Sequence, residues 1–269
     1  MKKVSLSVLA AVLSFNFIGA SSARADEGRV INEELVLKDP TVANPKNFLV
    51  GGALEGWFVT GPYSTSQNGV IVANGNINGG LLGENFFFGY GNLTLQYTHR
   101  EGSFNINSTF ITGNLTTTDN EKQFENEYTA RWLFKVSKHF NPYAIVGYNG
   151  TSVLDNTLNS KNGAFLGASK TSYSSSLWGG GAIVPFNQRF GMRADIRLLF
   201  TNGKFVNNNG FTSSGSGVGG AGTLTGYVNI VKGLNLQAGF KEQVLNAGPN
   251  VSSFARFGLF GSLGYSYKF

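Results

Sequence analysis

The sequence predicts an all-β protein, an antiparallel up-and-down barrel that crosses a membrane with its strands. Three observations predict this class: an N-terminal leader with the character of an export signal, segments with apolar side chains at every second position, and connections that alternate between long and short. Each is typical of a strand-built membrane barrel, and together they favour that fold over a soluble β-sandwich.

Residues 1–25 have the organisation of a secretory signal peptide. Two lysines open the segment, an apolar stretch covers residues 4–19, and Ala23-Arg24-Ala25 forms a small-x-small cleavage site. An uncleaved membrane anchor is the alternative, which Ser14 and Asn16 disfavour because they interrupt a run already short for a span. We therefore expect a mature chain that starts at Asp26.

Composition excludes several classes of function. The formal net charge is +6, and it falls to +3 without the leader because residues 1–25 contain three basic and no acidic residues. This balance is too mild to indicate nucleic-acid binding. The chain contains no cysteine, which excludes a disulfide scaffold and any thiolate metal or redox site.

Beyond the leader no apolar run approaches the ~20 residues of a transmembrane helix, so any insertion must use strands. The clearest alternation lies at the C-terminus, where only Phe260 breaks the pattern. We place about ten strands, with eight or twelve as alternatives. Their predicted ranges are 48–60, 86–99, 103–115, 124–137, 142–153, 173–184, 190–201, 219–231, 234–244 and 255–269.

The connections between these strands alternate in length. The longer set is 61–85, 116–123, 154–172, 202–218 and 245–254, and the shorter set is 100–102, 138–141, 185–189 and 232–233. Long loops outside the cell and tight turns in the periplasm, with both termini periplasmic, give this layout. A further hairpin within 69–82 is the alternative that would raise the strand count.

Aromatic residues near the predicted strand ends indicate interfacial girdles. The residues assigned to the girdles are Trp57, Phe58, Phe86, Phe87, Phe88, Tyr97, Phe140, Tyr143, Phe186 and Phe190.

Charged residues fall mostly on the parity opposite the apolar ones. A charge facing lipid at mid-membrane costs about 2–4 kcal/mol for Arg or Lys, so these side chains must point into the barrel. The predicted lumen network consists of Glu55, Glu125, Glu127, Arg131, Lys135, Arg193, Asp195, Arg197 and Arg256, with Lys241 on the same parity. Within it we expect Glu55, Arg131, Asp195 and Arg197 to meet near the middle of the barrel.

The last six residues, Gly264 to Phe269, end in an aromatic with apolar residues at alternate positions before it. This strand resembles the assembly signature of bacterial outer-membrane proteins, and the chain resembles the broad class of small OmpA-, OmpX- and OmpW-like barrels. The resemblance assigns the signature to Tyr265, Tyr267 and Phe269. It implies a Gram-negative outer membrane, contact with lipid and lipopolysaccharide, and insertion by the outer-membrane assembly machinery after escort by periplasmic chaperones.

The predicted domain organisation follows. Residues 1–25 form the signal peptide, 26–47 a periplasmic N-terminal tail or a small plug inside the barrel, and 48–269 the barrel itself.

The sequence offers little for catalysis. Its two histidines, His99 and His139, lie beside predicted periplasmic turns, away from the outer rim where outer-membrane proteases and deacylases of this size work. Two separated histidines without nearby acids predict no metal site. Gly215, Gly217 and Gly220 spell G-x-G-x-x-G, but a strand follows where a dinucleotide site needs a helix, so we expect a flexible loop and no cofactor.

We therefore expect a non-enzymatic, porin-like barrel with a narrow or closed charged lumen, because a barrel of about eight strands is just filled by its own side chains. The alternative is an adhesive or structural barrel that acts through its long extracellular loops, and an outer-membrane enzyme ranks last. The sequence specifies neither a solute nor an oligomeric state.

Overall fold

The computed structural model describes residues 48–268, apart from 68–69, 112–115, 138, 161–167, 188 and 232. The predicted signal peptide and the segment 26–47 lie outside the described residues. No described helix has the length and apolar character needed to cross a membrane.

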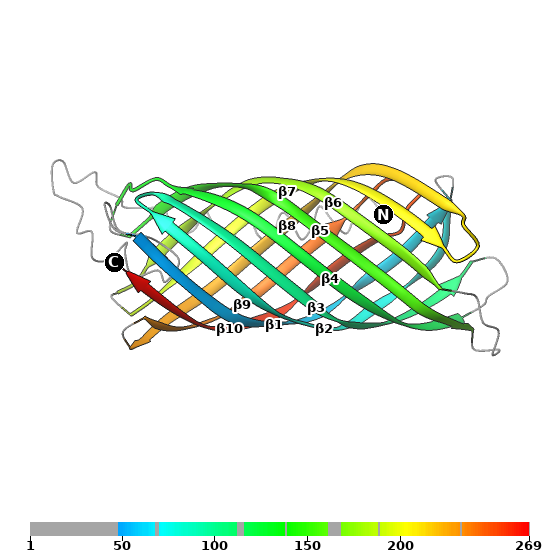
Figure 1. The fold of residues 1–269 in the computed structure, drawn as a ribbon, viewed down its shortest axis with the longest axis horizontal. Helices are drawn as coiled ribbons and strands as arrows, with labels where there is room; N and C mark the ends of the chain where they lie inside the picture. The colour runs from blue at the N-terminus through cyan, green and yellow to red at the C-terminus, as the bar shows by residue number, and fades with distance from the viewer. Residues whose placement is uncertain are drawn as a thin grey trace. The chain divides into compact units, whose positions relative to one another are not determined.

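The described chain forms ten antiparallel strands that close into a barrel (Figure 1). The strands are β1 (Phe48–Gln67), β2 (Val70–Tyr90), β3 (Leu93–Phe110), β4 (Thr116–Leu133), β5 (Asn141–Ser160), β6 (Ser169–Pro185), β7 (Phe190–Asn207), β8 (Thr212–Val231), β9 (Leu234–Leu245) and β10 (Ser253–Lys268).

Each strand pairs with its neighbours in sequence, and β1 pairs with β10 to complete the ring. The register places Leu49 opposite Lys268 and Tyr63 opposite Phe254, so the first and last strands run together along most of their length. Figure 1 shows these two strands, blue and red, side by side. Closure leaves no unpaired edge, which is the condition for a sheet to stand in lipid.

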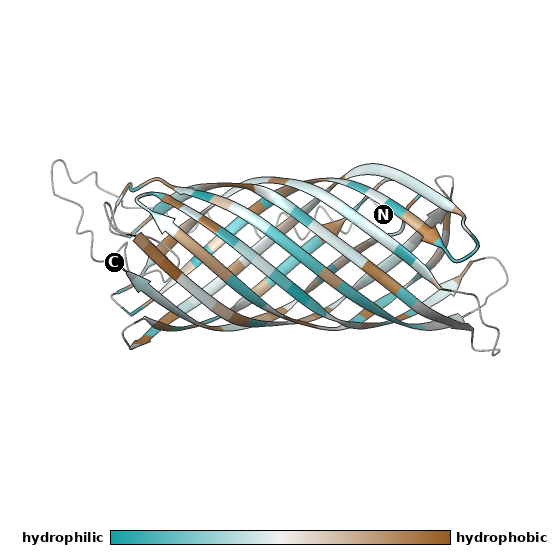
Figure 2. Ribbon diagram, in the orientation of Figure 1, coloured by the Kyte–Doolittle hydropathy of each residue, from teal (hydrophilic) through white to brown (hydrophobic). Residues whose placement is uncertain are grey.

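Alternation along each strand gives the barrel an apolar exterior. Phe58, Leu54 and Leu82 expose 76%, 71% and 73% of their surface, whereas Trp57 between the first two exposes 2%. Figure 2 shows hydrophobic and hydrophilic residues interleaved along the strands. Further outward apolar residues are Phe86, Phe88, Leu95, Trp132, Val146, Trp178, Leu198, Leu224, Leu236, Leu259 and Leu263.

The exterior changes from apolar to polar along a single row of paired residues. The row starts at Leu263 and Leu54, and passes through Glu84, His99, Asn126, Gly150, Ser174 and Asn202 on β2 to β7. Because strands in a barrel are tilted against its axis, such a row climbs around the wall and leaves the apolar band. β2 to β7 therefore continue well beyond the band.

This extension corrects the predicted connections. The predicted loop 61–85 is strand on both sides of residues 68–69, and 154–172 and 202–218 also consist largely of strand. The predicted turn at 100–102 is wrong as well, because β3 runs straight through it. The chain turns instead at Gly91-Asn92, where Gly91 has a φ of 58° that favours glycine. The described connections do not sort into a long and a short set.

Several aromatic residues face the lumen instead of lipid, and three of them belong to the predicted girdles. Trp57, Phe87 and Tyr143, which the sequence places in the girdles, expose 5% or less of their surface. Phe260, which breaks the alternation of the last strand, packs against the cluster that contains Trp57. The parity of the strand, and not aromatic character alone, decides which side a ring occupies.

We expect Leu54→Arg to destabilise the barrel by about 2–4 kcal/mol, because it places a cation on the lipid-facing surface. The measurement is the free energy of unfolding of the refolded protein in phospholipid vesicles, by denaturant titration. Asn76→Arg is the matched control, since Asn76 is outward and exposed on β2 beyond the apolar band. Equal effects of the two substitutions would show that the band is misplaced.

Candidate functional site

The predicted lumen residues occupy inward positions on four strands. Glu55 lies on β1, Glu125, Glu127 and Arg131 on β4, the three charged residues Arg193, Asp195 and Arg197 on β7, and Arg256 on β10; Lys135 follows the end of β4. Arg256 and Glu125 expose none of their surface. The parity of the charged residues thus places them inside the barrel.

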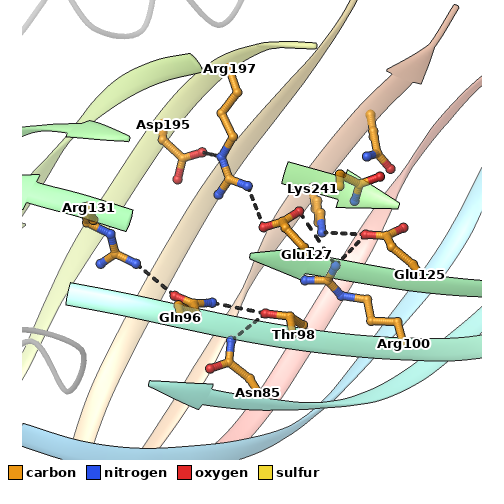
Figure 3. A network of polar contacts seen from close by, with 12 residues as sticks. Asn85, Gln96, Thr98, Arg100, Glu125, Glu127, Arg131, Asp195, Arg197 and Lys241 are labelled. Carbon is orange, nitrogen blue, oxygen red and sulfur yellow. Dashed lines mark hydrogen bonds and ion pairs between the residues drawn. The ribbon is translucent and has the colours of Figure 1, made fainter. Parts of the chain in front are cut away.

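Glu125 is the centre of the network, with cations from three other strands around it. Figure 3 shows two of them, Arg100 and Lys241, beside the carboxylate. Arg100 Nη1 on β3 lies 2.6 Å from Glu125 Oε1, and Lys241 Nζ on β9 lies 3.9 Å from the same oxygen. Arg256 Nη2 on β10 binds Glu125 Oε2, and Arg256 Nε donates to Gln243 Oε1 at 2.8 Å. One carboxylate thereby links β3, β4, β9 and β10.

Arg197 forms a second centre. Its Nε lies 2.7 Å from Asp195 Oδ1 on the same strand, and its Nη1 lies 2.9 Å from Glu127 Oε1 on β4. The hydroxyl of Tyr143 on β5 donates to Asp195 Oδ2 at 3.0 Å. The two centres are connected, because Glu127 Oε2 lies 4.0 Å from Arg100 Nη1.

The predicted meeting of four residues is confirmed for Asp195 and Arg197. Asp195 and Arg197 bind each other, whereas Glu55 binds Arg100 Nε. Arg131 donates from Nη2 to Gln96 Oε1 at 3.1 Å and lies over the ring of Tyr143, 5.2 Å from its centroid. Tyr143 thereby joins Arg131 to the second centre, because its hydroxyl donates to Asp195.

Arg100 is the residue that the sequence interpretation missed. It contacts three acids, yet it falls in the segment 100–102 that we interpreted as a turn. The spacing of Arg100 could have indicated an inward position, since Thr98, Arg100 and Phe104 share the inward parity of one uninterrupted strand.

An apolar layer lies next to the network inside the lumen. Trp57 and Val59 on β1 follow Glu55 on the inward face, and they pack with inward residues of β2 and β3. The cluster comprises Trp57, Val59, Ile77, Leu81, Phe104 and Ile106, with Tyr63 and Phe260 packed against it. Lys241 Nζ and the Arg256 guanidinium each lie 4.7 Å from the Trp57 ring centroid, which joins the two layers by cation–π contacts.

Residues 246–252 connect β9 to β10 and fold over the inner wall. They lie at the end of the barrel opposite to the start of β1. Ala247 and Val251 expose 1% or less of their surface. Tyr173 on β6 donates to the Ser252 carbonyl oxygen at 2.6 Å, and Ser213 on β8 donates to that of Asn250 at 2.6 Å. We call residues 246–252 the inward segment.

Two glycines of the G-x-G-x-x-G sequence make room for the inward segment. A Cβ on Gly217 would lie 2.6 Å from the Asn246 carbonyl oxygen, and one on Gly215 would collide with that of Ala247. Gly220 faces the other way, and a Cβ there would meet only the Arg197 carbonyl oxygen at 3.5 Å, an ordinary contact. These residues lie in β8, so the predicted flexible loop is wrong and the glycines serve close packing.

Among the described lumen side chains we consider two cavities of different size. The larger measures about 70 Å³ and lies at the charge network, where Trp57 and Phe260 form part of its wall. The smaller measures about 20 Å³ and lies beneath the inward segment, with Ile77, Ile106 and Ser252 in its wall. Members of the apolar cluster line both cavities, so the cluster lies between them.

The histidines lie away from this lumen. His99 is in the middle of β3 and not beside a turn, and its Nδ1 lies 2.9 Å from Asn126 Oδ1 on the outward face. His139 is exposed in the connection between β4 and β5, at the end where β1 starts. The described residues contain no group of three or more His, Cys, Asp or Glu side chains that could hold a metal.

Of the predicted assembly signature, Tyr265 and Tyr267 are outward and exposed, and Phe269 lies outside the described residues.

Comparison with solved structures places the fold among bacterial outer-membrane barrels. The outer membrane protease OmpT from Escherichia coli is similar with a TM-score of 0.60 at 7% identity, over 84% of this chain and 97% of that one. OprG from Pseudomonas aeruginosa gives 0.39 at 9% identity, over 85% and 98%. The transport unit of the autotransporter AIDA-I from E. coli gives 0.47 at 9%, over 96% and 97%. No family model matches the chain, and no curated protein does.

The closed ring of ten described strands, its apolar exterior and its buried charges define the class. The protein has the fold of a transmembrane β-barrel of the bacterial outer membrane.

We expect Glu125→Gln to destabilise the barrel by about 3–5 kcal/mol, because it leaves Arg256 fully buried beside neutral Gln243 without its carboxylate. Adding Arg256→Gln should recover part of this loss, since the stranded charge is then removed. Denaturant titration of both proteins in vesicles measures the difference. Glu101→Gln, at an exposed outward position, is the control. A double variant less stable than the single one would contradict this account of the network.

Proposed function

We propose that the protein is an integral outer-membrane barrel of the porin-like type whose lumen is closed at rest. The observation that carries the proposal is the filled interior. The charge network, the apolar cluster and the inward segment succeed one another along the lumen, and the cavities beside them measure about 70 and 20 Å³. A cavity of this size holds a few water molecules.

The inward segment is the part of this filling that can move with the smallest loss of structure. It is a connection and not a strand, so its displacement breaks no strand pairing in the ring. Side-chain hydrogen bonds hold it to the wall, such as those from Tyr173 and Ser213. Displacement of a short connection costs much less than separation of two strands. We infer that it acts as the gate of the lumen.

The charge network supports a structural role for the remaining filling. A buried cation that loses its partner carries a large penalty, so these residues hold one another in place. Rotation of any one side chain would leave others unpaired. We therefore assign conduction, where it occurs, to movement of the inward segment and of the apolar side chains beneath it, and not to rearrangement of the network.

A non-enzymatic role fits the positions of the two histidines. His99 faces outward and His139 lies in a connection, so neither meets the lumen acids Glu55, Glu125 and Glu127. The likeness to OmpT, at 7% identity, is one of fold.

A surface-binding role is the second candidate, and one observation favours it. β2 to β7 extend past the apolar band with outward polar residues, which include Asn74, Asn76, Asn105 and Asn107. These strand ends would present a rigid polar wall to the cell exterior. Substitution of the four residues by alanine would then abolish cell adhesion while leaving the barrel folded.

We expect Gly217→Val to raise the conductance of the protein in planar lipid bilayers several-fold over wild type. The added side chain collides with the backbone at Asn246 and displaces the inward segment from the wall. Gly220→Val is the matched control and should leave the conductance low, because a Cβ there fits the space. A wide, permanently open wild-type pore, or equal conductance of the two variants, would overturn the gated-lumen proposal.

A further inference from the structure

The outward face of β4 to β7 carries charge of one sign. Among its described residues are three exposed lysines, Lys122 on β4, Lys170 on β6 and Lys204 on β7, and no aspartate or glutamate. Outward glutamates occur on other strands, and Glu101 on β3 is diagonal to Lys122 in the register of the sheet. Lys170 and Lys204 are farther from it. This part of the wall therefore favours an anionic partner.

Lys170 and Lys204 are close enough to share one anionic group. Lys204 pairs with Ser172, and Lys170 pairs with Val206, so the two lysines are diagonal neighbours on the same face of β6 and β7. Such neighbours are about 7–8 Å apart. Lysine side chains are long and flexible, so both ammonium groups can reach a phosphate between them.

A groove with a polar lining begins at Lys204 and crosses β6, β5 and β4 on the outer wall. It measures about 520 Å³, and we call it the polar groove. Small residues lie between large ones here, which leaves the wall hollowed. The small residues are Gly150, Ser152, Ser172 and Ser174, and the large ones include Phe124, Tyr128, Tyr148 and Lys204.

A second groove lies next to the polar groove, on the side of the apolar band. It measures about 710 Å³ and we call it the apolar groove; its lining includes Phe86, Phe88, Leu95 and Val146. Members of the apolar lining are exposed on the lipid-facing surface, as Phe86 is at 55%. A groove of this composition accepts the hydrocarbon chain of a lipid.

Tyr128 and Tyr148 line both grooves and thereby join them. The Tyr148 ring leans along its strand toward the polar groove, because a Cβ on Gly150 would lie 3.4 Å from Tyr148 Cε1 and 3.7 Å from its hydroxyl oxygen. Tyrosine has an apolar ring and a polar tip, which suits the edge of a membrane. The two grooves thus form one surface that is apolar at one end and polar and basic at the other.

We propose that this surface binds one molecule of a phosphorylated glycolipid. An acyl chain lies in the apolar groove, a sugar ring lies in the polar groove, and a phosphate is held by Lys170 and Lys204. A volume of about 520 Å³ is within the range of ~300–1,000 Å³ typical of small-molecule sites, and it exceeds what a phosphate alone would fill. Serine hydroxyls and tyrosine rings suit a sugar, since they offer hydrogen bonds and a flat face. The site goes beyond the proposed closed lumen and does not require conduction.

Purified lipid A, an acylated and phosphorylated disaccharide, is the probe. The refolded protein in detergent micelles is titrated with lipid A, and native mass spectrometry measures the fraction of protein that carries one lipid. We expect saturable binding of a single molecule. Lipid A from which the phosphates have been removed should bind several-fold more weakly, and so should phosphatidylglycerol, which has a phosphate and acyl chains but no sugar. This comparison uses the unaltered protein.

Substitutions then locate the site. Lys170→Gln/Lys204→Gln should weaken lipid A binding at least several-fold, whereas Lys170→Arg/Lys204→Arg should retain it. Arg189→Gln, which removes an exposed cation in the connection between β6 and β7, should leave the affinity unchanged. Heat-modifiable migration verifies that each variant is folded.

A bulky side chain in the polar groove tests the place of the sugar. Ser174→Trp should reduce binding several-fold, and Asn76→Trp, at an outward exposed position on β2, is the control of equal size.

Three outcomes would overturn the proposal. They are unsaturable binding of lipid A, equal binding of phosphatidylglycerol, and an unchanged affinity of the folded lysine-to-glutamine double variant. The first would indicate a lipid coat without a site, and the second an anionic lipid without a sugar. None of these measurements depends on conductance, so the failure of the lipid site and that of the gated lumen are distinguishable.

Discussion

The burial of Glu125 is the constraint around which the lumen is organised. A carboxylate with no exposed surface is tolerated only beside cations, and those cations come from β3, β9 and β10. Arg100 then requires Glu55 and Glu127, and Glu127 requires Arg197. Each added charge compensates for another, so the chain of pairs extends around the wall. A single buried acid thus determines the positions of residues on six of the described strands.

The class of fold was predictable because apolar and polar residues alternate wherever one side of a strand contacts lipid. The parity of Arg193, Asp195 and Arg197 against Leu198 and Phe200 places charge inside and apolar residues outside. The same signal fades where strands leave the membrane. Along β2 the outward residues Asn74 and Asn76 look like a loop in sequence, although they are paired in the sheet. The predicted strands therefore end too early, and Arg100 was assigned to a turn.

The inward apolar residues could not be predicted from alternation. Trp57 shares the parity of Glu55, so the pattern places both inside, whereas its aromatic character suggests an interface. The lumen of the ten described strands must be filled by side chains. Trp57 can contribute to this filling because apolar side chains from β2 and β3 pack against it there. Such meetings depend on register across strands, which a single sequence does not specify. The same holds for the inward segment, since the glycines that receive it lie on a different strand.

The charge network also bears on how the barrel comes to close. Glu125 lies in the fourth strand, and its partners Lys241 and Arg256 lie in the last two, more than a hundred residues further along the chain. Until those strands arrive, Glu125 lacks two of its three cations, and the inner face of the partly assembled sheet carries hydrated charges whose pairing is incomplete. An open sheet with such a face resists collapse on itself and adhesion to other chains. The pairing of these charges is therefore completed only when the ring closes. This makes closure a late and cooperative event in assembly.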